Sequence, residues 1–221
     1  MFKRLIDLFI AIVALILLSP LLLTVMIILK FTGEGEVFYL QKRLGFFNKK
    51  FNIIKFATML KNSPNIGSGS LTLRGDPRVL PLGKFLRKSK INELPQIFNV
   101  IIGNMSIVGP RPQMQVDFDK FPINKRNEIY KSKPGITGMG SIIFRDEEKW
   151  ISDFDGDKHK FYKDKIAPYK TDVEIWYYQN QSVLIDFKLI FLTAWVIIFP
   201  NSNVVYKVFE SLPKKPSYLK N

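Results

Sequence analysis

The chain of 221 residues is long enough for one ordinary domain with an appendage, and 47% of its residues are hydrophobic, which excludes an intrinsically disordered chain. Its 33 Lys and Arg outnumber its 19 Asp and Glu, and the net charge of +14 indicates anionic partners such as nucleic acid, lipid headgroups or phosphorylated substrates. The absence of cysteine excludes disulfides, thiolate catalysis and cysteine-based zinc sites.

The first 30 residues predict a membrane segment. Positions 5–29 are apolar apart from Asp7, Ser19 and Thr24. This run is too long for the apolar region of a signal peptide and has no small-residue cleavage site, so we expect the mature protein to retain it. Because about 20 apolar residues suffice to span a bilayer as a helix, a single span is the simplest arrangement.

Two features oppose a simple span. Lys3 and Arg4 precede the apolar run and further basic residues follow it, so a span would place positive charge on the wrong side in either orientation. Pro20 lacks a backbone N–H in mid-run, and Ser19 offers a hydroxyl to the backbone group that is freed. A helix broken at Ser19-Pro20 would enter and leave by one face of the membrane. This re-entrant arrangement and the span both stay open.

Residues 37–44 and 51–59 predict two short strands of a β-hairpin around a turn at 47–49, and the Gly and Ser content of 63–70 predicts a loop. Between positions 37 and 93 there are 12 Lys or Arg and only two acidic residues. Such a run is usually a solvated face, but beside a membrane segment it also suits an anionic lipid surface.

The segment 89–112 combines helix signals with polar chemistry. Asn92 suits an N-cap, Glu93 suits the first turn, and Pro95 sits where a missing N–H is tolerated. Gly103 follows the last apolar residue as a stop signal. These signals predict a helix over residues 93–102.

The N-terminus of this predicted helix is a candidate anion site. Arg87, Lys88 and Lys90 precede it, and Arg111 stands between two prolines that fix its backbone. A helix N-terminus carries unsatisfied N–H groups and a partial positive charge, which favour a phosphate. A helix cap with a solvated basic flank is the alternative interpretation.

The C-terminal part predicts further helices. Three adjacent acids at 146–148 either cap a helix and aid solubility or serve a metal or catalytic site. The apolar stretch from Leu189 to Phe199 has 11 residues, too few to span a membrane, and predicts a buried helix or one at the membrane surface. Residues 211–221 are a basic, Pro-rich tail that we expect to be loosely ordered.

The predicted fold class is therefore helix-rich α+β. It comprises an apolar membrane segment over 1–30 and a domain over 31–210 with a short β-hairpin and membrane-surface amphipathic helices. The tail over 211–221 completes the chain.

An ordered series of short motifs runs from residue 3 to residue 200. The motifs are Lys3-Arg4 and Asp7, Ser19-Pro20, Lys55-Phe56 followed by Met59, Asp76-Pro77-Arg78, a Gly-x-Phe-Leu-Arg run ending at Arg87, Asn92-Glu93-Leu94-Pro95-Gln96, Asn99-Val100, Met105-Ser106, Gly109-Pro110-Arg111-Pro112 and Pro134-Gly135-Ile136-Thr137-Gly138. In this order they resemble the small monotopic phosphoglycosyl transferases, the bacterial sugar transferases that start membrane polysaccharide and glycoconjugate synthesis.

The resemblance implies an enzyme on the cytoplasmic face of the bacterial inner membrane, with a re-entrant (monotopic) membrane helix over 1–30 that is broken at Ser19-Pro20 and a cytosolic catalytic-type domain over 31–210. It implies transfer of a sugar 1-phosphate from a UDP-sugar to a polyprenyl phosphate with Mg²⁺, on a chain whose Lys3, Arg4, Ser19 and Pro20 meet the membrane. The implied partners are the UDP-sugar, polyprenyl phosphate and anionic membrane lipids, with no nucleic acid and with a homodimer as a further assembly. The implied substrate-binding residues are Lys55, Arg78, Arg87 and Arg111.

The sequence departs from the family at Asn92. The resemblance places the catalytic and metal-binding residues at Asn92 and Glu93, where the family has Asp-Glu and the Asp is the nucleophile that forms a phosphosugar intermediate. An amide cannot act as an anionic nucleophile. Three accounts stay open: Glu93 or one of the acids at 146–148 supplies the carboxylate, transfer proceeds directly to the polyprenyl phosphate, or the protein binds substrate without turnover. A laboratory substitution that traps substrate would look the same.

A nucleic-acid-binding protein and a non-catalytic membrane scaffold are the alternatives from other classes. The charge of +14 and the 14% of aromatic residues motivate the first. However, the sequence has no helix-turn-helix, zinc-finger or single-strand-binding signature, and a polybasic region beside an apolar helix favours lipid.

Overall fold

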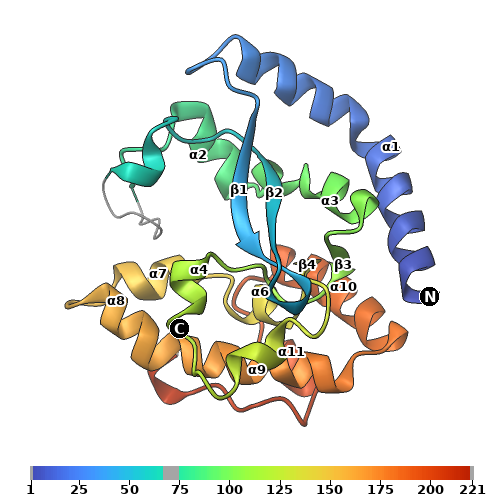
Figure 1. Cartoon of the computed structure of the whole chain (residues 1–221), viewed down its shortest axis with the longest axis vertical. Helices are drawn as coiled ribbons and strands as arrows, with labels where there is room; N and C mark the ends of the chain where they lie inside the picture. Colours follow the sequence, from blue (N-terminus) through green and yellow to red (C-terminus); the bar gives the residue numbers. More distant parts are fainter. Residues whose placement is uncertain (1, 67–74, 220–221) are drawn as a thin grey trace. The chain divides into compact units, whose positions relative to one another are not determined.

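The computed structural model describes residues 2–66 and 75–219, and the chain divides into two compact units. The first unit comprises Met1–Arg43 and Lys50–Ile107, and the second comprises Leu44–Lys49 and Val108–Asn221. Most elements are helices and the strands are short, as Figure 1 shows, so the helix-rich α+β class is confirmed.

One long helix and a β-hairpin dominate the chain up to residue 108. In chain order the elements are α1 (Phe2–Lys30), β1 (Phe38–Leu44), the 3₁₀ turn η1 (Phe46–Asn48), β2 (Lys50–Phe56), η2 (Ser63–Asn65), α2 (Pro81–Lys88), η3 (Ile91–Glu93), α3 (Gln96–Ile102) and β3 (Ser106–Val108). The pairing of β1 with β2 around η1 confirms the predicted hairpin. Of the loop predicted at 63–70, residues 67–70 lie outside the described residues.

α1 continues through Ser19 and Pro20, so the predicted break is instead a bend within one continuous helix. Pro20 has no N–H to donate to the carbonyl of Ile16, and the hydroxyl of Ser19 donates to that carbonyl at 2.8 Å. Because this bond replaces the missing one, the helix does not end, and Figure 1 shows α1 changing direction along its length.

α1 is attached to the first unit along both of its arms. Near the start, the guanidinium of Arg4 donates to two carbonyl oxygens in the last turn of α3, at 2.6 and 3.0 Å. The buried carboxylate of Asp7 accepts from the Ser106 hydroxyl at 2.8 Å and from the Ile107 N–H at 3.0 Å. The second arm joins a core cluster with β2 and α2, whose buried members are Leu22, Val25, Leu29, Phe56 and Leu86.

The remaining face of α1 is apolar and exposed, and includes Leu5, Phe9, Leu17 and Ile27. Among the described residues, α1 is the one helix with the length and composition to cross a membrane. An exposed apolar face of this extent on a helix attached to a folded unit suggests association with a membrane.

The helix predicted over 93–102 is shorter than expected, and the N-cap role predicted for Asn92 is wrong. α3 begins three residues later, and Asn92 lies in η3, where its side chain makes no capping hydrogen bond. Pro95 cannot donate the N–H that an α-helical turn requires, so the chain before it closes as a 3₁₀ turn. The predicted end is confirmed, because Gly103 adopts φ 100° after the last helical residue.

The second unit is built mainly from helices. Its elements from residue 115 are α4 (Gln115–Phe118), α5 (Arg126–Ile129), β4 (Gly135–Thr137), α6 (Met139–Ile143), α7 (Glu147–Ser152), α8 (Lys158–Phe161), the π-helical turn η4 (Tyr162–Ile166), α9 (Ala167–Asn180), α10 (Val183–Ile198), α11 (Val204–Val208) and η5 (Ser217–Leu219). Within this unit, the Gly109 N–H donates to the Thr137 carbonyl of β4 at 2.9 Å.

α10 has two apolar faces. One face packs into the unit through Leu189, Leu192 and Val196, and the other leaves large apolar side chains exposed. The exposed residues recur at helical spacing and are Leu184, Phe187, Phe191, Trp195 and Ile198.

The expectation of a loosely ordered tail is wrong for its first residues. Leu212 is buried, and the carbonyl of Pro213 accepts a hydrogen bond from the Tyr169 hydroxyl of α9 at 2.8 Å. The indole of Trp176 on the same helix donates to the Ser211 hydroxyl at 3.1 Å. Side chains of α9, rather than the local sequence of the tail, therefore fix this segment.

Candidate active site

The first unit brings together Lys55 of β2 and Glu93 of η3, which are 38 positions apart in the sequence. The Lys55 ammonium donates to Oε1 of Glu93 at 3.0 Å, and the two side chains are only 13% and 17% exposed. Beside Glu93, Asn92 is buried, and among the described residues its Oδ1 has no hydrogen-bond partner. A buried, unpaired oxygen next to a carboxylate and an ammonium is the strongest indication of a ligand site in this unit.

The residue types at this point fit a magnesium ion. Mg²⁺ takes oxygen ligands and is commonly held by one or two protein groups, with water and substrate phosphates completing its shell. Oδ1 of Asn92 is an unengaged oxygen ligand, and Glu93 is the adjacent carboxylate. The described residues contain no cluster of three or more acidic or histidine side chains that would hold a metal without substrate.

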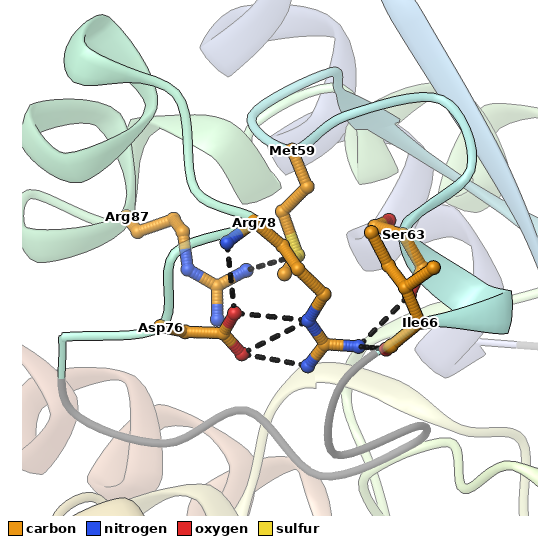
Figure 2. A network of polar contacts seen from close by, with 6 residues as sticks. All are labelled: Met59, Ser63, Ile66, Asp76, Arg78 and Arg87. Atoms are coloured by element: carbon orange, nitrogen blue, oxygen red, sulfur yellow. Dashed lines mark hydrogen bonds and ion pairs between the residues drawn. The ribbon is translucent and has the colours of Figure 1, made fainter.

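Arg78 is engaged in a buried network, shown in Figure 2. Its guanidinium pairs with the carboxylate of Asp76, at 2.9 Å from Nε to Oδ1 and 2.6 Å from Nη2 to Oδ2. Nη1 also donates to the carbonyls of Ser63 at 2.8 Å and Ile66 at 2.9 Å, and Arg78 is 3% exposed. Hydrogen bonding to Asp76 raises the pKa of Arg78 above its ordinary value. These contacts give the guanidinium a structural role, and its predicted role in substrate binding stays a prediction.

The guanidinium of Arg87 makes fewer hydrogen bonds than that of Arg78. Arg87 lies in the last turn of α2, and its Nη1 is 3.8 Å from the thioether sulfur of Met59, as Figure 2 also shows. Sulfur is a weak acceptor, and within the described residues it is the one hydrogen-bond partner of this guanidinium. Arg87 therefore keeps the capacity to bind an anion in two-point fashion.

Arg111 lies in the second unit, where its main chain is held by two buried side chains. The Arg111 N–H donates to Oε1 of Glu174 on α9 at 3.1 Å. The Tyr130 hydroxyl donates to the Arg111 carbonyl at 2.9 Å and accepts from the Gln113 N–H at 2.8 Å. The sequence motif singled out Arg111 but neither of the residues that hold it.

Glu174 carries a perturbed carboxyl group. It is 2% exposed, and burial raises its pKa to about 7 against the opposing effects of the Arg111 N–H, Lys170, the Arg111 charge and the Gly140 N–H. Among the described residues, its Oε2 has no hydrogen-bond partner. In the sequence, a carboxylate among the apolar positions of α9 was the one feature that could have indicated a buried acidic group at Glu174.

Of the acids at 146–148, Glu147 is engaged within the second unit. The carboxylate of Glu147 forms an ion pair with the buried Lys170 at 2.5 Å. No sequence motif singled out the neighbouring Arg145. Among the described residues, its buried Nη1 has no hydrogen-bond partner.

Comparisons with known proteins identify the family of this chain. The model of the family described as "Bacterial sugar transferase" matches residues 1–200. The exopolysaccharide production protein ExoY of Sinorhizobium fredii is 35% identical over 206 residues, which cover 86% of this chain and 83% of that protein.

Two longer relatives carry enzyme names. A UDP-N-acetylgalactosamine-undecaprenyl-phosphate N-acetylgalactosaminephosphotransferase of Aeromonas hydrophila is 34% identical over 89% of this chain and 43% of its own length. An undecaprenyl-phosphate glucose phosphotransferase of Komagataeibacter xylinus is 33% identical over 89% of this chain and 36% of its own length. This chain therefore spans less than half the length of both phosphotransferases.

The match over 200 residues and the ExoY relative confirm the resemblance found in the motifs: the chain belongs to the bacterial sugar transferase family, whose named relatives include the two phosphotransferases.

Proposed function

We propose that this protein is a phosphoglycosyl transferase that moves a sugar 1-phosphate from a UDP-sugar to a membrane polyprenyl phosphate. An oxygen of the acceptor phosphate attacks the sugar-bearing phosphorus, the bond from that phosphorus to the UMP oxygen breaks, and UMP leaves. The names of the relatives support both the phosphoryl transfer and the undecaprenyl phosphate acceptor. The observation that carries the proposal is at the position of the family's Asp-Glu motif: Glu93 pairs with Lys55, and the buried Oδ1 of the preceding Asn92 has no hydrogen-bond partner among the described residues.

Each polar residue of the site has a role in this proposal. Asn92 and Glu93 hold Mg²⁺, and when bound the ion neutralises charge on the diphosphate. Lys55 orients the carboxylate of Glu93, and its positive charge stabilises the negative charge that develops on the phosphate during transfer. Arg87 binds two oxygens of one phosphate. Arg111, in the second unit, is assigned to phosphate binding by its sequence motif.

Asn92 decides the route of the reaction. Because its amide cannot form the covalent phosphosugar intermediate, transfer proceeds directly to the acceptor or uses the neighbouring carboxylate of Glu93. Asn92 also favours a second candidate function, a family member that binds its substrates without turnover.

The proposed location is the cytoplasmic face of the bacterial inner membrane, with α1 inserted as a re-entrant helix. Two observations support it. Both arms of α1 are attached to one compact unit, by Arg4 and Asp7 on the first arm and by Leu29 on the second. In addition, α10 presents an unpartnered apolar face with Trp195, a residue type that favours the membrane interface.

Release of UMP tests the reaction. The purified protein is given Mg²⁺, undecaprenyl phosphate and a panel of UDP-sugars, and UMP is measured for the wild type, Asn92→Asp and Glu93→Gln, with Glu147→Gln as the matched control. We expect Asn92→Asp to raise UMP release roughly 100-fold or more if only the nucleophile is missing, because covalent catalysis splits the transfer into two easier steps. Labelled phosphosugar should then accumulate on Asn92→Asp without the acceptor.

Thermal unfolding provides a second measurement that does not depend on turnover. Asn92→Asp places a buried carboxylate beside Glu93, so we expect the variant to unfold at a lower temperature than the wild type without Mg²⁺ and to recover with it. Wild-type turnover that Glu93→Gln abolishes and Glu147→Gln spares would assign the carboxylate to Glu93. An Asn92→Asp variant that binds nucleotide and Mg²⁺ but stays inert with every sugar would favour the binding protein.

A further inference from the structure

The main chain of Arg111 is unusually constrained for a segment with no helix or strand of its own. Pro110 and Pro112 fix the backbone on either side of it. The Gly135 N–H donates to the Pro110 carbonyl at 3.0 Å, so the start of the segment is also tied to β4. Both polar groups of the Arg111 backbone are then bonded to buried side chains rather than to other backbone groups.

Tyr130 reaches Arg111 from the C-terminal end of α5 and is fully buried. Its hydroxyl bridges two backbone groups, because it donates to the Arg111 carbonyl at 2.9 Å and accepts from the Gln113 N–H at 2.8 Å. Its ring packs against Phe118, with centroids 5.6 Å apart. A phenol held by its ring can thus fix the chain on both sides of Pro112.

Glu174 reaches Arg111 from α9. Its Oε1 accepts from the Arg111 N–H at 3.1 Å, and the Gly140 N–H is a second donor to the same carboxyl group. Position 140 must be glycine, because the Cβ of any other residue would lie 2.1 Å from Oε1 of Glu174 and clash with it. Glu174 therefore ties the Arg111 segment to the start of α6.

A buried carboxyl group is a costly way to accept two N–H bonds, since a neutral acceptor would avoid the cost of burying its charge. Its charge also attracts the guanidinium of Arg111, and hydrogen bonds to an ionised acceptor are stronger than neutral ones. The carboxylate thus restrains the backbone and the side chain of the same arginine.

We propose that Tyr130 and Glu174 are positioning residues for Arg111, which hold its main chain so that its guanidinium is presented to the diphosphate of the nucleotide sugar. This inference rests on the proposed function. Neither residue needs to touch the substrate, and both act through Arg111.

A double-mutant cycle on the full chain tests this assignment, with UDP and Mg²⁺ as the probe and Kd measured by calorimetry. Tyr130→Phe keeps the ring and removes only the hydroxyl, and we expect it to weaken UDP binding about tenfold, the loss that about 1.4 kcal/mol produces. In an Arg111→Ala background the same change should have almost no effect on Kd, because the group that Tyr130 positions is absent.

Tyr169→Phe is the matched control. It also removes a hydroxyl that bonds within the second unit, to the Tyr206 hydroxyl and the Pro213 carbonyl, away from the Arg111 segment. We expect a loss of stability comparable with that of Tyr130→Phe and an unchanged Kd for UDP. Glu174→Gln, which keeps one carbonyl acceptor, should bind UDP more tightly than Glu174→Leu, which keeps none.

The outcomes separate this inference from the function on which it rests. If the wild type binds UDP and Tyr130→Phe weakens binding equally with and without the Arg111 side chain, the positioning role is overturned and the proposed function stands. An unchanged Kd in both Tyr130→Phe and Glu174→Leu would overturn it as well. Absence of UDP binding by the wild type would overturn both.

Discussion

Five buried side-chain oxygens lack a hydrogen-bond partner among the described residues, and two of them, Oδ1 of Asn92 and Oε2 of Glu174, belong to the groups discussed above. Buried polar atoms are nearly always paired in folded proteins, so each of these two requires an explanation. For Asn92 the explanation that we propose is a ligand, because Asn92 precedes Glu93 in the sequence and Glu93 pairs with Lys55. For Glu174 it is burial: the carboxyl group accepts from the Arg111 and Gly140 N–H groups, which lower its pKa, but the larger effect of burial raises the pKa to about 7.

The raised pKa of Glu174 predicts a specific pH dependence of stability. The ordinary pKa of 4.5 applies to the unfolded chain and the value of about 7 to the folded protein, so between these pH values the folded state holds a proton that the unfolded state has lost. The contribution of Glu174 to the free energy of unfolding is therefore fully present below about pH 4.5 and is lost as the pH rises to about 7. Lys170, Arg111 and the Gly140 N–H act on this group in the opposite direction.

Urea unfolding at pH 5 and pH 8 measures this effect. Glu174→Gln should lose less stability than the wild type between the two pH values, because its side chain does not titrate. Asp172→Asn on the same helix removes a half-exposed carboxylate paired with Lys125, and this control should keep the wild-type dependence. A wild-type dependence in Glu174→Gln would show that Glu174 titrates at its ordinary pKa.

At the scale of elements, the bend in α1 results from a pair of neighbouring residues. Pro20 removes the bond to the Ile16 carbonyl and Ser19 replaces it, so the helix changes direction at little cost in hydrogen bonding. Asp7 and Arg4 then attach the first arm to α3 and β3, which a free membrane span does not require. The proposed re-entrant helix thus depends on the bend and on the attachment of both arms.

Cysteine labelling decides the topology, since the natural chain has no cysteine. Phe2→Cys and Lys30→Cys in oriented membranes should react with an impermeant thiol reagent from the same side. Accessibility from opposite sides would establish a span instead. Pro20→Leu restores the N–H and should favour a straight helix, whereas Leu21→Ala next to it leaves the bend and serves as the control.

At the scale of the whole molecule, the net charge of +14 accompanies exposed apolar faces on α1 and α10. A basic surface and an apolar face together favour an anionic membrane over nucleic acid, because the exposed aliphatic side chains of α1 can be buried in lipid but not against a phosphate backbone. The same combination suits an enzyme with one soluble and one lipid-bound anionic substrate.

Binding assays at physiological salt test this preference. We expect the protein to bind vesicles that contain anionic lipid more tightly than neutral vesicles, and to bind generic oligonucleotides only weakly. Phe187→Ser with Phe191→Ser, on the exposed face of α10, should reduce vesicle binding without changing the free energy of unfolding by more than about 0.5 kcal/mol. Tight oligonucleotide binding with no preference for vesicles would favour the nucleic-acid-binding alternative.

The sequence by itself determined the family, the apolar N-terminal helix, the hairpin and the helix end at Gly103, because each element and each family motif depends on residues that are close together in the chain. Only the tertiary structure decided what distant residues do to one another. The side chain of Asn92 makes no capping hydrogen bond. The guanidinium of Arg78 pairs with Asp76 and donates to two backbone carbonyls, and side chains of α9 hold the first residues of the tail. It also brought Tyr130 and Glu174 to Arg111 across 19 and 63 positions of sequence. Spacing along the chain cannot show such contacts, because they arise where helices pack and bury polar groups that must then find partners.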